Sequence, residues 1–149
     1  MKAKSIILQL LVLILIVPAA YSQPREIYIE GHDQLRYTVE TIKAKPGETL
    51  KITLKTVSAM DKSQMSHNWV LLKQGTDPMN FVTKGLQHPK SEYIDPALTD
   101  KIIAKTDMLG DGETDSVTFK VPDKKGEYQY VCTFRAHFQA GMKGKLIVE

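Results

Sequence analysis

The sequence of 149 residues has only one cysteine, Cys132. A single cysteine cannot form a disulfide within the chain, so the protein is excluded from the class of small secreted domains held together by disulfides. Taken alone, this cysteine is either a buried apolar residue or a functional thiolate, and both interpretations are open until its neighbours are considered.

The sequence also lacks an excess of charge of one sign. It has 20 lysine and arginine residues against 17 aspartate and glutamate residues. Two of the lysines, Lys2 and Lys4, belong to a predicted leader, and without them 18 basic residues face 17 acidic ones. The other lysines are interleaved with acidic residues and form no patch, so no nucleic-acid partner is expected.

Long apolar runs are absent except at the N-terminus, where residues 6–17 are apolar apart from Gln9. The lysines before this run and the small residues of Ala20-Tyr21-Ser22 after it are typical of a secretory signal peptide. We therefore predict a signal peptide over residues 1–22, a single domain over residues 23–149, and a periplasmic or secreted location. The run is shorter than a typical membrane span, and membrane attachment is expected only if the signal is not cleaved.

Alternation of apolar and polar residues dominates the rest of the chain. In Thr49–Lys55, Leu50, Ile52 and Leu54 alternate with polar residues, which predicts a strand with one buried face. Seven further stretches are predicted as strands: Ile27–Glu30, Leu35–Lys43, Asn68–Leu72, Lys101–Thr106, Ser116–Val121, Tyr128–Cys132 and Lys145–Val148. Glycine, proline and aspartate separate them at turns.

About eight short strands of this kind predict an all-β fold, an antiparallel β-sandwich. One segment departs from the pattern. Asp77–Asp95 carries apolar residues without alternation and is expected to form an irregular flap with a short helix, which ends before Pro96.

The stretch CTFRAHFQAGM places Cys132, His137 and Met142 at intervals of five residues. A thiolate and two imidazoles with a weak axial thioether are the donor set that suits copper. Zinc favours four firm ligands, and methionine is not among them. This interpretation of the cysteine requires a second histidine from elsewhere in the chain.

His67 is the best candidate, because it precedes an apolar strand and a β-sandwich gathers the ends of distant strands at one pole. His32 stands beside an acidic residue and is interpreted as an ordinary turn residue. His88 lies in the predicted flap without a ligand-like spacing. Trp69 directly follows the candidate ligand segment and is predicted to be a core residue.

Three segments carry a family resemblance: SHNWVLL, TDMLGDGETDSVTFKV and CTF followed by His137 and MKGKLIV. On these segments the sequence resembles the small blue-copper proteins of the cupredoxin family, and among them the azurins. The resemblance implies a Greek-key β-sandwich with one copper ion that cycles between Cu(I) and Cu(II). Carried over by position, it implies His67, Cys132 and His137 as equatorial ligands and Met142 as the axial ligand.

The resemblance also implies two supporting roles. The backbone carbonyl of Ser66 is placed as a weak axial contact, where azurins have a glycine. Asn68 is expected to hydrogen-bond the turn at Cys132 and Thr133, which would tie the two ligand segments together.

Three features depart from the azurin pattern. The interval from His137 to Met142 is one residue longer and matches the plastocyanin-like His-x4-Met spacing. Azurin's structural disulfide is absent. Arg135-Ala136 replaces a proline-glycine pair, and we expect Arg135 to favour an acidic partner.

The function implied by the resemblance is transfer of single electrons between redox partners such as cytochromes or copper enzymes. Electrons are expected to leave through the edge of His137. The surrounding surface is expected to be an apolar patch that suits brief docking. Its predicted members are Met65, Leu86, Phe134, Phe138 and Ala140. A monomer is expected.

Other functions are weighed against this one. The alternative is a copper chaperone or buffer, which typically uses open sites rich in methionine and histidine without a thiolate. Multicopper enzymes typically add a His-Cys-His run, whereas Thr133 follows Cys132 here. A thiol hydrolase would need an oriented third group beside Cys132 and His137, and none is evident. No enzymatic activity is predicted.

Overall fold

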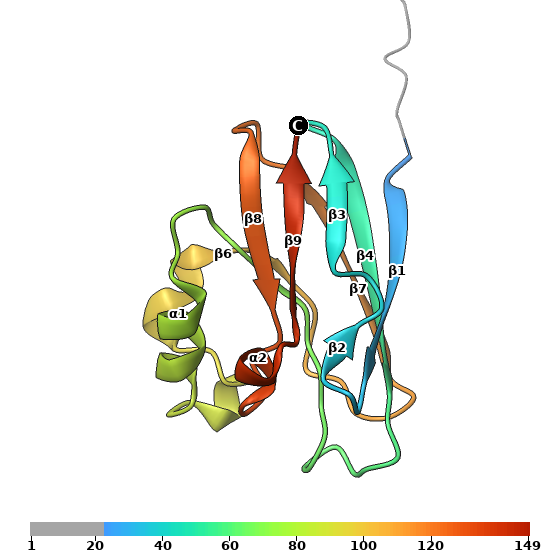
Figure 1. Ribbon diagram of the computed structural model, residues 1–149, viewed down its shortest axis with the longest axis vertical. Coiled ribbons are helices and arrows are strands. Elements are labelled where there is room, and N and C mark those ends of the chain that lie inside the picture. The colour runs from blue at the N-terminus through green and yellow to red at the C-terminus, as the bar shows by residue number, and fades with distance from the viewer. Residues whose placement is uncertain (1–22) are drawn as a thin grey trace, which may run out of the picture.

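The alternating stretches form two packed sheets in the computed structural model, which describes residues 23–149 (Figure 1). The predicted signal peptide lies outside the described residues. The first sheet has the order β2-β1-β4-β7 and the second the order β3-β9-β8-β5-β6. The strands are β1 (Arg25–His32), β2 (Arg36–Tyr37), β3 (Thr41–Ala44), β4 (Thr49–Val57), β5 (Val70–Leu72), β6 (Ile102–Lys105), β7 (Thr114–Lys120), β8 (Gly126–Val131) and β9 (Lys143–Val148).

The predicted β-sandwich is confirmed, but its sheets are mixed and not purely antiparallel. β1 pairs with β4 in parallel, and β3 pairs with β9 in parallel. The stretch predicted as one strand over Leu35–Lys43 is divided between β2 in the first sheet and β3 in the second. Side chains alternate between the two faces in parallel and antiparallel strands alike. The sequence pattern therefore could not reveal the parallel pairings or the division of this stretch between two sheets.

The space between the sheets is filled by apolar side chains on the inward face of each strand. Leu50, Ile52 and Leu54 of β4 are fully buried, as their alternation predicts. Each such side chain contributes about 1.5–3 kcal/mol by leaving water. Trp69 is also fully buried and packs against Tyr130, with ring centroids 5.2 Å apart, which confirms it as a core residue.

The predicted flap contains the helix α1 (Pro78–Gly85) and the short 3-10 turn η1 (Pro89–Ser91), and is followed by a second 3-10 turn, η2 (Pro96–Lys101). The carboxylate of Asp77 accepts the N–H of Met79 and so caps the start of α1. The helix buries Phe81 and Val82 in a second apolar cluster. This cluster also contains Val70 and Leu72 of β5, Val131 of β8, and Phe138. The flap therefore packs against β5 and the last residue of β8.

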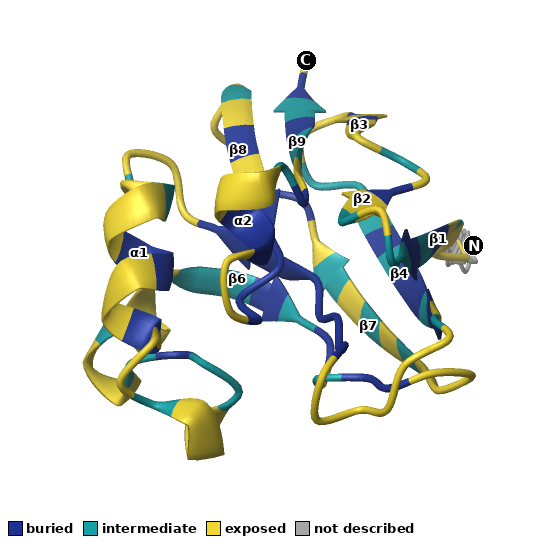
Figure 2. Ribbon diagram, turned by 60° about the horizontal axis from the view of Figure 1, so that its bottom comes forward, coloured by how far each residue is buried: buried dark blue, intermediate teal, exposed yellow. Residues whose placement is uncertain are grey.

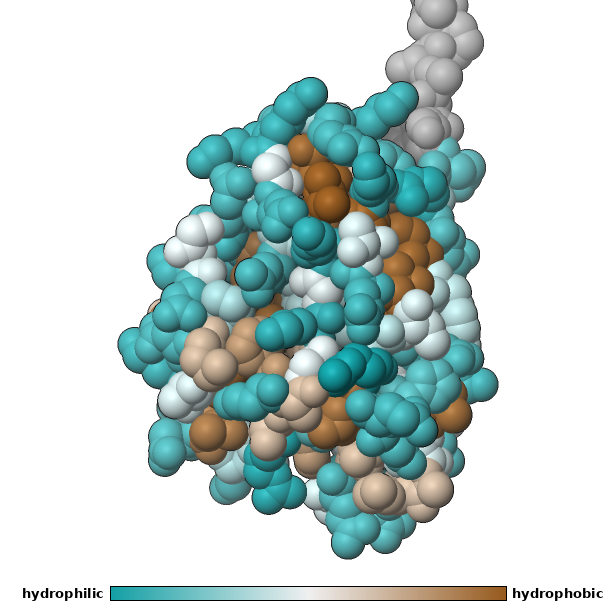
Figure 3. All heavy atoms as spheres, in the orientation of Figure 1, coloured by the Kyte–Doolittle hydropathy of each residue, from teal (hydrophilic) through white to brown (hydrophobic). Residues whose placement is uncertain are grey.

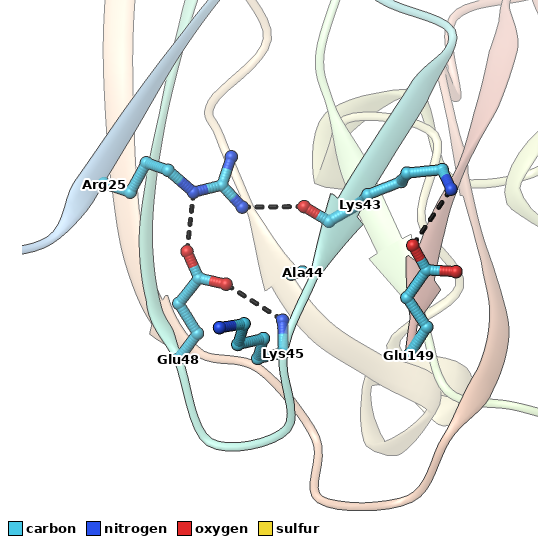
Figure 4. A pocket seen from close by; sticks show the side chains of 6 residues that line it. All are labelled: Arg25, Lys43, Ala44, Lys45, Glu48 and Glu149. Atoms are coloured by element: carbon cyan, nitrogen blue, oxygen red, sulfur yellow. Dashed lines mark hydrogen bonds and ion pairs between the residues drawn. The ribbon is translucent and has the colours of Figure 1, made fainter.

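The two ends of the sandwich differ in character. At the end where β9 finishes, Arg25, Lys43, Glu48 and Glu149 line a hollow in which the charged groups bind one another (Figure 4). Arg25 Nε lies 2.6 Å from a Glu48 oxygen, and Lys43 Nζ lies 2.9 Å from a Glu149 oxygen. At the other end, buried segments converge beside the short helix α2 (His137–Ala140) (Figure 2). The chemically distinctive residues lie at this second end.

Among the described residues, no helix combines the length and the apolar character needed to cross a bilayer. In the orientation of Figure 1, hydrophilic side chains cover most of the visible face (Figure 3).

Candidate metal centre

His67 lies shortly before β5 and is held there by an isolated β-bridge. Its N–H donates to the carbonyl of Leu109 over 2.9 Å, and the N–H of Leu109 donates back to His67 over 2.8 Å. β5 begins three residues later, so the backbone at His67 is fixed between a bridge and a strand. The bridge on one side and the strand on the other therefore give His67 a defined position.

Cys132 and Met142 lie at the two ends of one closed loop. Cys132 directly follows β8, and Met142 directly precedes β9. The N–H of Cys132 donates to the carbonyl of Met142 over 3.1 Å, which extends the β8–β9 ladder by one pair. The antiparallel sheet therefore delivers both sulfur-bearing residues to the same point.

The loop between them contains the one-turn helix α2, which was not predicted from the sequence. Ala136 precedes it with φ 60°, and Gly141 follows it with φ 112°. The N–H of Met142 donates to the carbonyl of His137 over 2.9 Å. The only sequence signal was Gly141, because glycine favours the left-handed position after a helix.

The side chains of His67, Cys132 and His137 converge on one another. One ligand atom of each lies within 4.8 Å of those of the other two. The Cys132 sulfur is 3.5 Å from His137 Nδ1, and the two imidazole centroids are 5.0 Å apart. Of the described residues, only these three form such a group, so His32 and His88 lie outside it. This brings together the three residues that the sequence analysis selected as equatorial ligands.

The centre is closed to water and leaves His67 without hydrogen-bond partners. His67 and Cys132 are fully buried, and His137 is 4% exposed. Neither ring nitrogen of His67 has a hydrogen-bond partner. A buried polar group without a partner destabilises a fold by about 1–3 kcal/mol, so its persistence indicates a role for these nitrogens beyond packing.

The protonation states of the three groups suit a metal ion. Burial, reinforced by the nearby His137, lowers the pKa of His67 to about 4 although Asp33 opposes the shift. Burial and then the charge of Arg135 lower the pKa of His137 to about 4. Both imidazoles are therefore neutral at pH 7, with free lone pairs. Burial raises the pKa of the Cys132 thiol to about 12, so a soft cation that takes the place of its proton would be favoured.

Met142 and Ser66 complete the surroundings of the three donors. Met142 is fully buried, and its terminal methyl and the His67 ring lie on the same side of Gly31, where a side chain would otherwise be. The Ser66 carbonyl oxygen is 3.9 Å from the Cys132 sulfur. Both residues are thus adjacent to the centre, where the family resemblance in the sequence places them.

The predicted tie through Asn68 is confirmed. Its side-chain oxygen accepts the N–H of Thr133 over 2.9 Å, and its side-chain nitrogen donates to the Thr133 hydroxyl over 2.8 Å. The Thr133 hydroxyl in turn donates to the carbonyl of Glu92 over 2.6 Å. Three segments that are distant in sequence are therefore locked together beside Cys132.

The surface around His137 differs from the predicted apolar patch. Met65, Phe134 and Phe138 are only 8%, 7% and 5% exposed, whereas Leu86 is 39% exposed. Leu86 and Ala140 are exposed as expected, whereas the expectation of an open patch is corrected for Met65, Phe134 and Phe138. Their rings and methyl groups are needed for packing, since Phe134 and Phe138 each belong to an apolar cluster.

A β-sandwich with a buried cluster of two imidazoles and one thiol at one pole defines the class of small copper-binding sandwich proteins. Residues 26–149 match the family model described as copper binding proteins, plastocyanin/azurin family. The chain therefore belongs to the plastocyanin/azurin family, and copper is its cofactor.

Individual relatives agree with this assignment. Azurin from Achromobacter denitrificans is 38% identical over 124 residues, which cover 81% of this chain and 82% of that protein. Auracyanin-B from Chloroflexus aurantiacus is 42% identical over 85 residues, 56% of this chain and 36% of that protein. The structure of auracyanin A from the same organism, described as a "blue" copper protein, aligns with a TM-score of 0.75 at 32% identity and covers 85% of this chain and 100% of that one.

Proposed function

We propose that this protein is an exported electron carrier with one copper ion held by His67, Cys132, His137 and Met142. The observation that carries the proposal is the closed cluster of two neutral imidazoles and one thiol, in which the His67 nitrogens have no other partner. When bound, copper supplies a one-electron couple between Cu(II) and Cu(I). The carbonyl of Ser66 is proposed as a weak axial contact.

The protein's contribution is a site that changes little between oxidation states. The bridge at Leu109 fixes His67, and the hydrogen bonds between Asn68 and Thr133 fix the cysteine segment against it. Complete burial of Cys132 and Met142 keeps water away from the sulfur atoms. A rigid, dry site requires little reorganisation when charge changes, which favours fast transfer.

His137 is proposed as the point where electrons enter and leave. It is 4% exposed, whereas His67, Cys132 and Met142 are completely buried. The partners would be redox proteins such as cytochromes or copper enzymes, docking on the face around His137 that includes Leu86. Such contacts are small and brief, and the protein is proposed to act as a monomer.

Two observations favour a carrier over a copper chaperone or an enzyme. A chaperone must release its metal, whereas the buried thiol and the two-sided tie through Asn68 would retain it. An enzyme needs room for a substrate beside the reactive group, whereas the side chains of His67, Cys132, His137 and Met142 are all buried. No enzymatic activity is proposed.

Export is proposed from the N-terminal sequence. Residues 1–22 would be removed as a signal peptide and residues 23–149 would act in the periplasm or outside the cell. Tethering to a membrane would occur only if the signal were retained.

Titration of the purified protein with Cu(II) tests the ligand assignment. We expect one equivalent to bind with an intense visible colour from charge transfer between the Cys132 thiolate and copper. Cys132→Ser should abolish the colour, and Met142→Leu should keep the colour but shift the reduction potential. His32→Gln is the matched control, because it removes a histidine that lies outside the cluster. A colourless wild-type protein, or loss of colour in the control, would contradict the assignment.

A further inference from the structure

Three cationic side chains lie against the loop that carries the proposed ligands. The Arg135 guanidinium stands over the Phe134 ring, 5.3 Å from its centroid. Lys143 Nζ stands over the Phe138 ring at 4.9 Å. Arg36 donates from its guanidinium to the Ala140 carbonyl over 2.5 Å. We name these three residues the basic collar.

The basic collar carries uncompensated charge. No carboxylate of the described residues lies within 4.0 Å of any of its three cations. The segment from Cys132 to Lys143 contains no acidic residue. By contrast, Lys105 pairs with Glu92 at 2.7 Å and Lys145 pairs with Glu127 at 2.9 Å.

The basic collar surrounds the exposed edge of the centre. The Phe134 ring beneath Arg135 has its centroid 4.8 Å from that of His137. Phe138 directly follows His137, and Ala140 is the last residue of the helix that His137 begins. This end of the molecule comes forward in Figure 2, where α2 lies between α1 and β2. The aromatic rings expected to form an apolar surface are therefore flanked by cations.

We propose that the basic collar is the docking surface for an acidic redox protein. The proposal rests on the proposed electron-carrier function and adds the chemistry of the partner. Because Phe134 and Phe138 beside His137 are buried, charge is the main attraction that the basic collar can offer. Uncompensated charges around a reactive edge speed the encounter with a partner of opposite sign and orient it. Aromatic faces hold Arg135 and Lys143 in place, and the Ala140 carbonyl holds Arg36, without neutralising these cations.

Small redox probes of opposite charge test this proposal on the copper-loaded protein. The reduced protein is oxidised by hexacyanoferrate(III), an anion, and by tris(phenanthroline)cobalt(III), a cation. We expect replacement of Arg36, Arg135 and Lys143 by glutamine to slow the anionic probe about tenfold at low ionic strength and to speed the cationic probe. Both effects should fade near 1 M salt, where the screening length is about 3 Å.

The matched control removes the same charge from the opposite end of the sandwich. Lys45, Lys124 and Lys125 lie on turns at the end where β8 begins, and all three are exposed. Their replacement by glutamine should leave the ratio of the two rates close to that of the wild type. Equal effects of the two triple variants, or no effect of the first, would overturn the proposal. A wild-type protein that is not redox active would instead refute the underlying function, so the two failures are distinguishable.

Discussion

At the scale of single residues, Gly31 of β1 shapes the proposed copper centre although it offers no ligand. A Cβ atom at this position would lie 2.8 Å from the terminal methyl of Met142 and 3.0 Å from two ring carbons of His67. The Gly31 backbone lies outside the left-handed region, so its conformation does not require glycine. Glycine is required here because Met142 and His67 occupy the space that a side chain at position 31 would fill.

We predict that Gly31→Ala changes the copper centre without unfolding the protein. The flexible end of Met142 is the group that can move most easily, so the axial thioether should be displaced. Overpacking of this kind lowers stability by about 1–3 kcal/mol. The visible spectrum and the reduction potential of the copper protein should both shift. In a Met142→Leu background, Gly31→Ala should add little further shift in potential, and an equal shift in both backgrounds would contradict the role assigned to Met142.

The protonation states of the three buried donors should set the number of protons released when copper binds. At pH 7 both histidines are neutral, since their pKa values are about 4, and the Cys132 thiol is protonated, since its pKa is about 12. Binding should therefore release about one proton, from Cys132, and affinity should rise about tenfold per pH unit. Calorimetry in buffers of different ionisation heat measures this number. Release of no proton would mean that Cys132 is not a ligand.

At the scale of elements, the centre depends on how the flap, the His67 segment and the loop after β8 meet at Thr133. The Thr133 hydroxyl accepts from Asn68 and donates to Glu92 in the flap. Glu92 and Tyr93 both have positive φ angles, 56° and 57°. An unusual backbone corner is therefore stabilised in part by this hydroxyl, since other contacts must offset the strain of such positions.

We predict that Thr133→Val weakens this junction, because it keeps the shape but leaves the Glu92 carbonyl and the Asn68 amide without their partner. The free energy of unfolding of the metal-free protein should fall by about 1–3 kcal/mol, and copper should dissociate faster. Urea unfolding measures the first effect. Thr133→Ser is the control, because it retains the hydroxyl and should retain the copper off-rate of the wild type. Equal off-rates for Val and Ser would show that the hydroxyl does not hold the loop.

The elements also show where sequence reasoning succeeds. Leu50, Ile52 and Leu54 predicted a strand correctly, because alternation depends only on burial. Cys132, His137 and His67 were selected because their donor chemistry is unusual, and the structure brings them together. The division of Leu35–Lys43 between two sheets was missed, since local alternation does not reveal which sheet a strand joins. The burial of Phe134 and Phe138 was also missed, because it depends on how α1 and the flap pack.

At the scale of the whole molecule, stability must come from the core and the metal, since Cys132 is the only cysteine. A ligand present at a hundredfold excess over its Kd adds about 2.7 kcal/mol to the folded state. For a domain of this size, we predict that copper raises the Tm by roughly 10 °C. Scanning calorimetry with and without copper measures the rise. A reducing agent added to the metal-free protein should leave its Tm unchanged, and a fall would contradict the absence of a disulfide.

The central claim is that the protein carries single electrons through one copper ion at the His67–Cys132–His137 centre. The most direct measurement is a redox titration of the copper-loaded protein, followed by its visible absorption. We predict that the colour disappears with one electron per protein, returns with one equivalent of oxidant, and survives repeated cycles. Loss of copper on reduction, or a colour that does not respond to one electron, would contradict the claim.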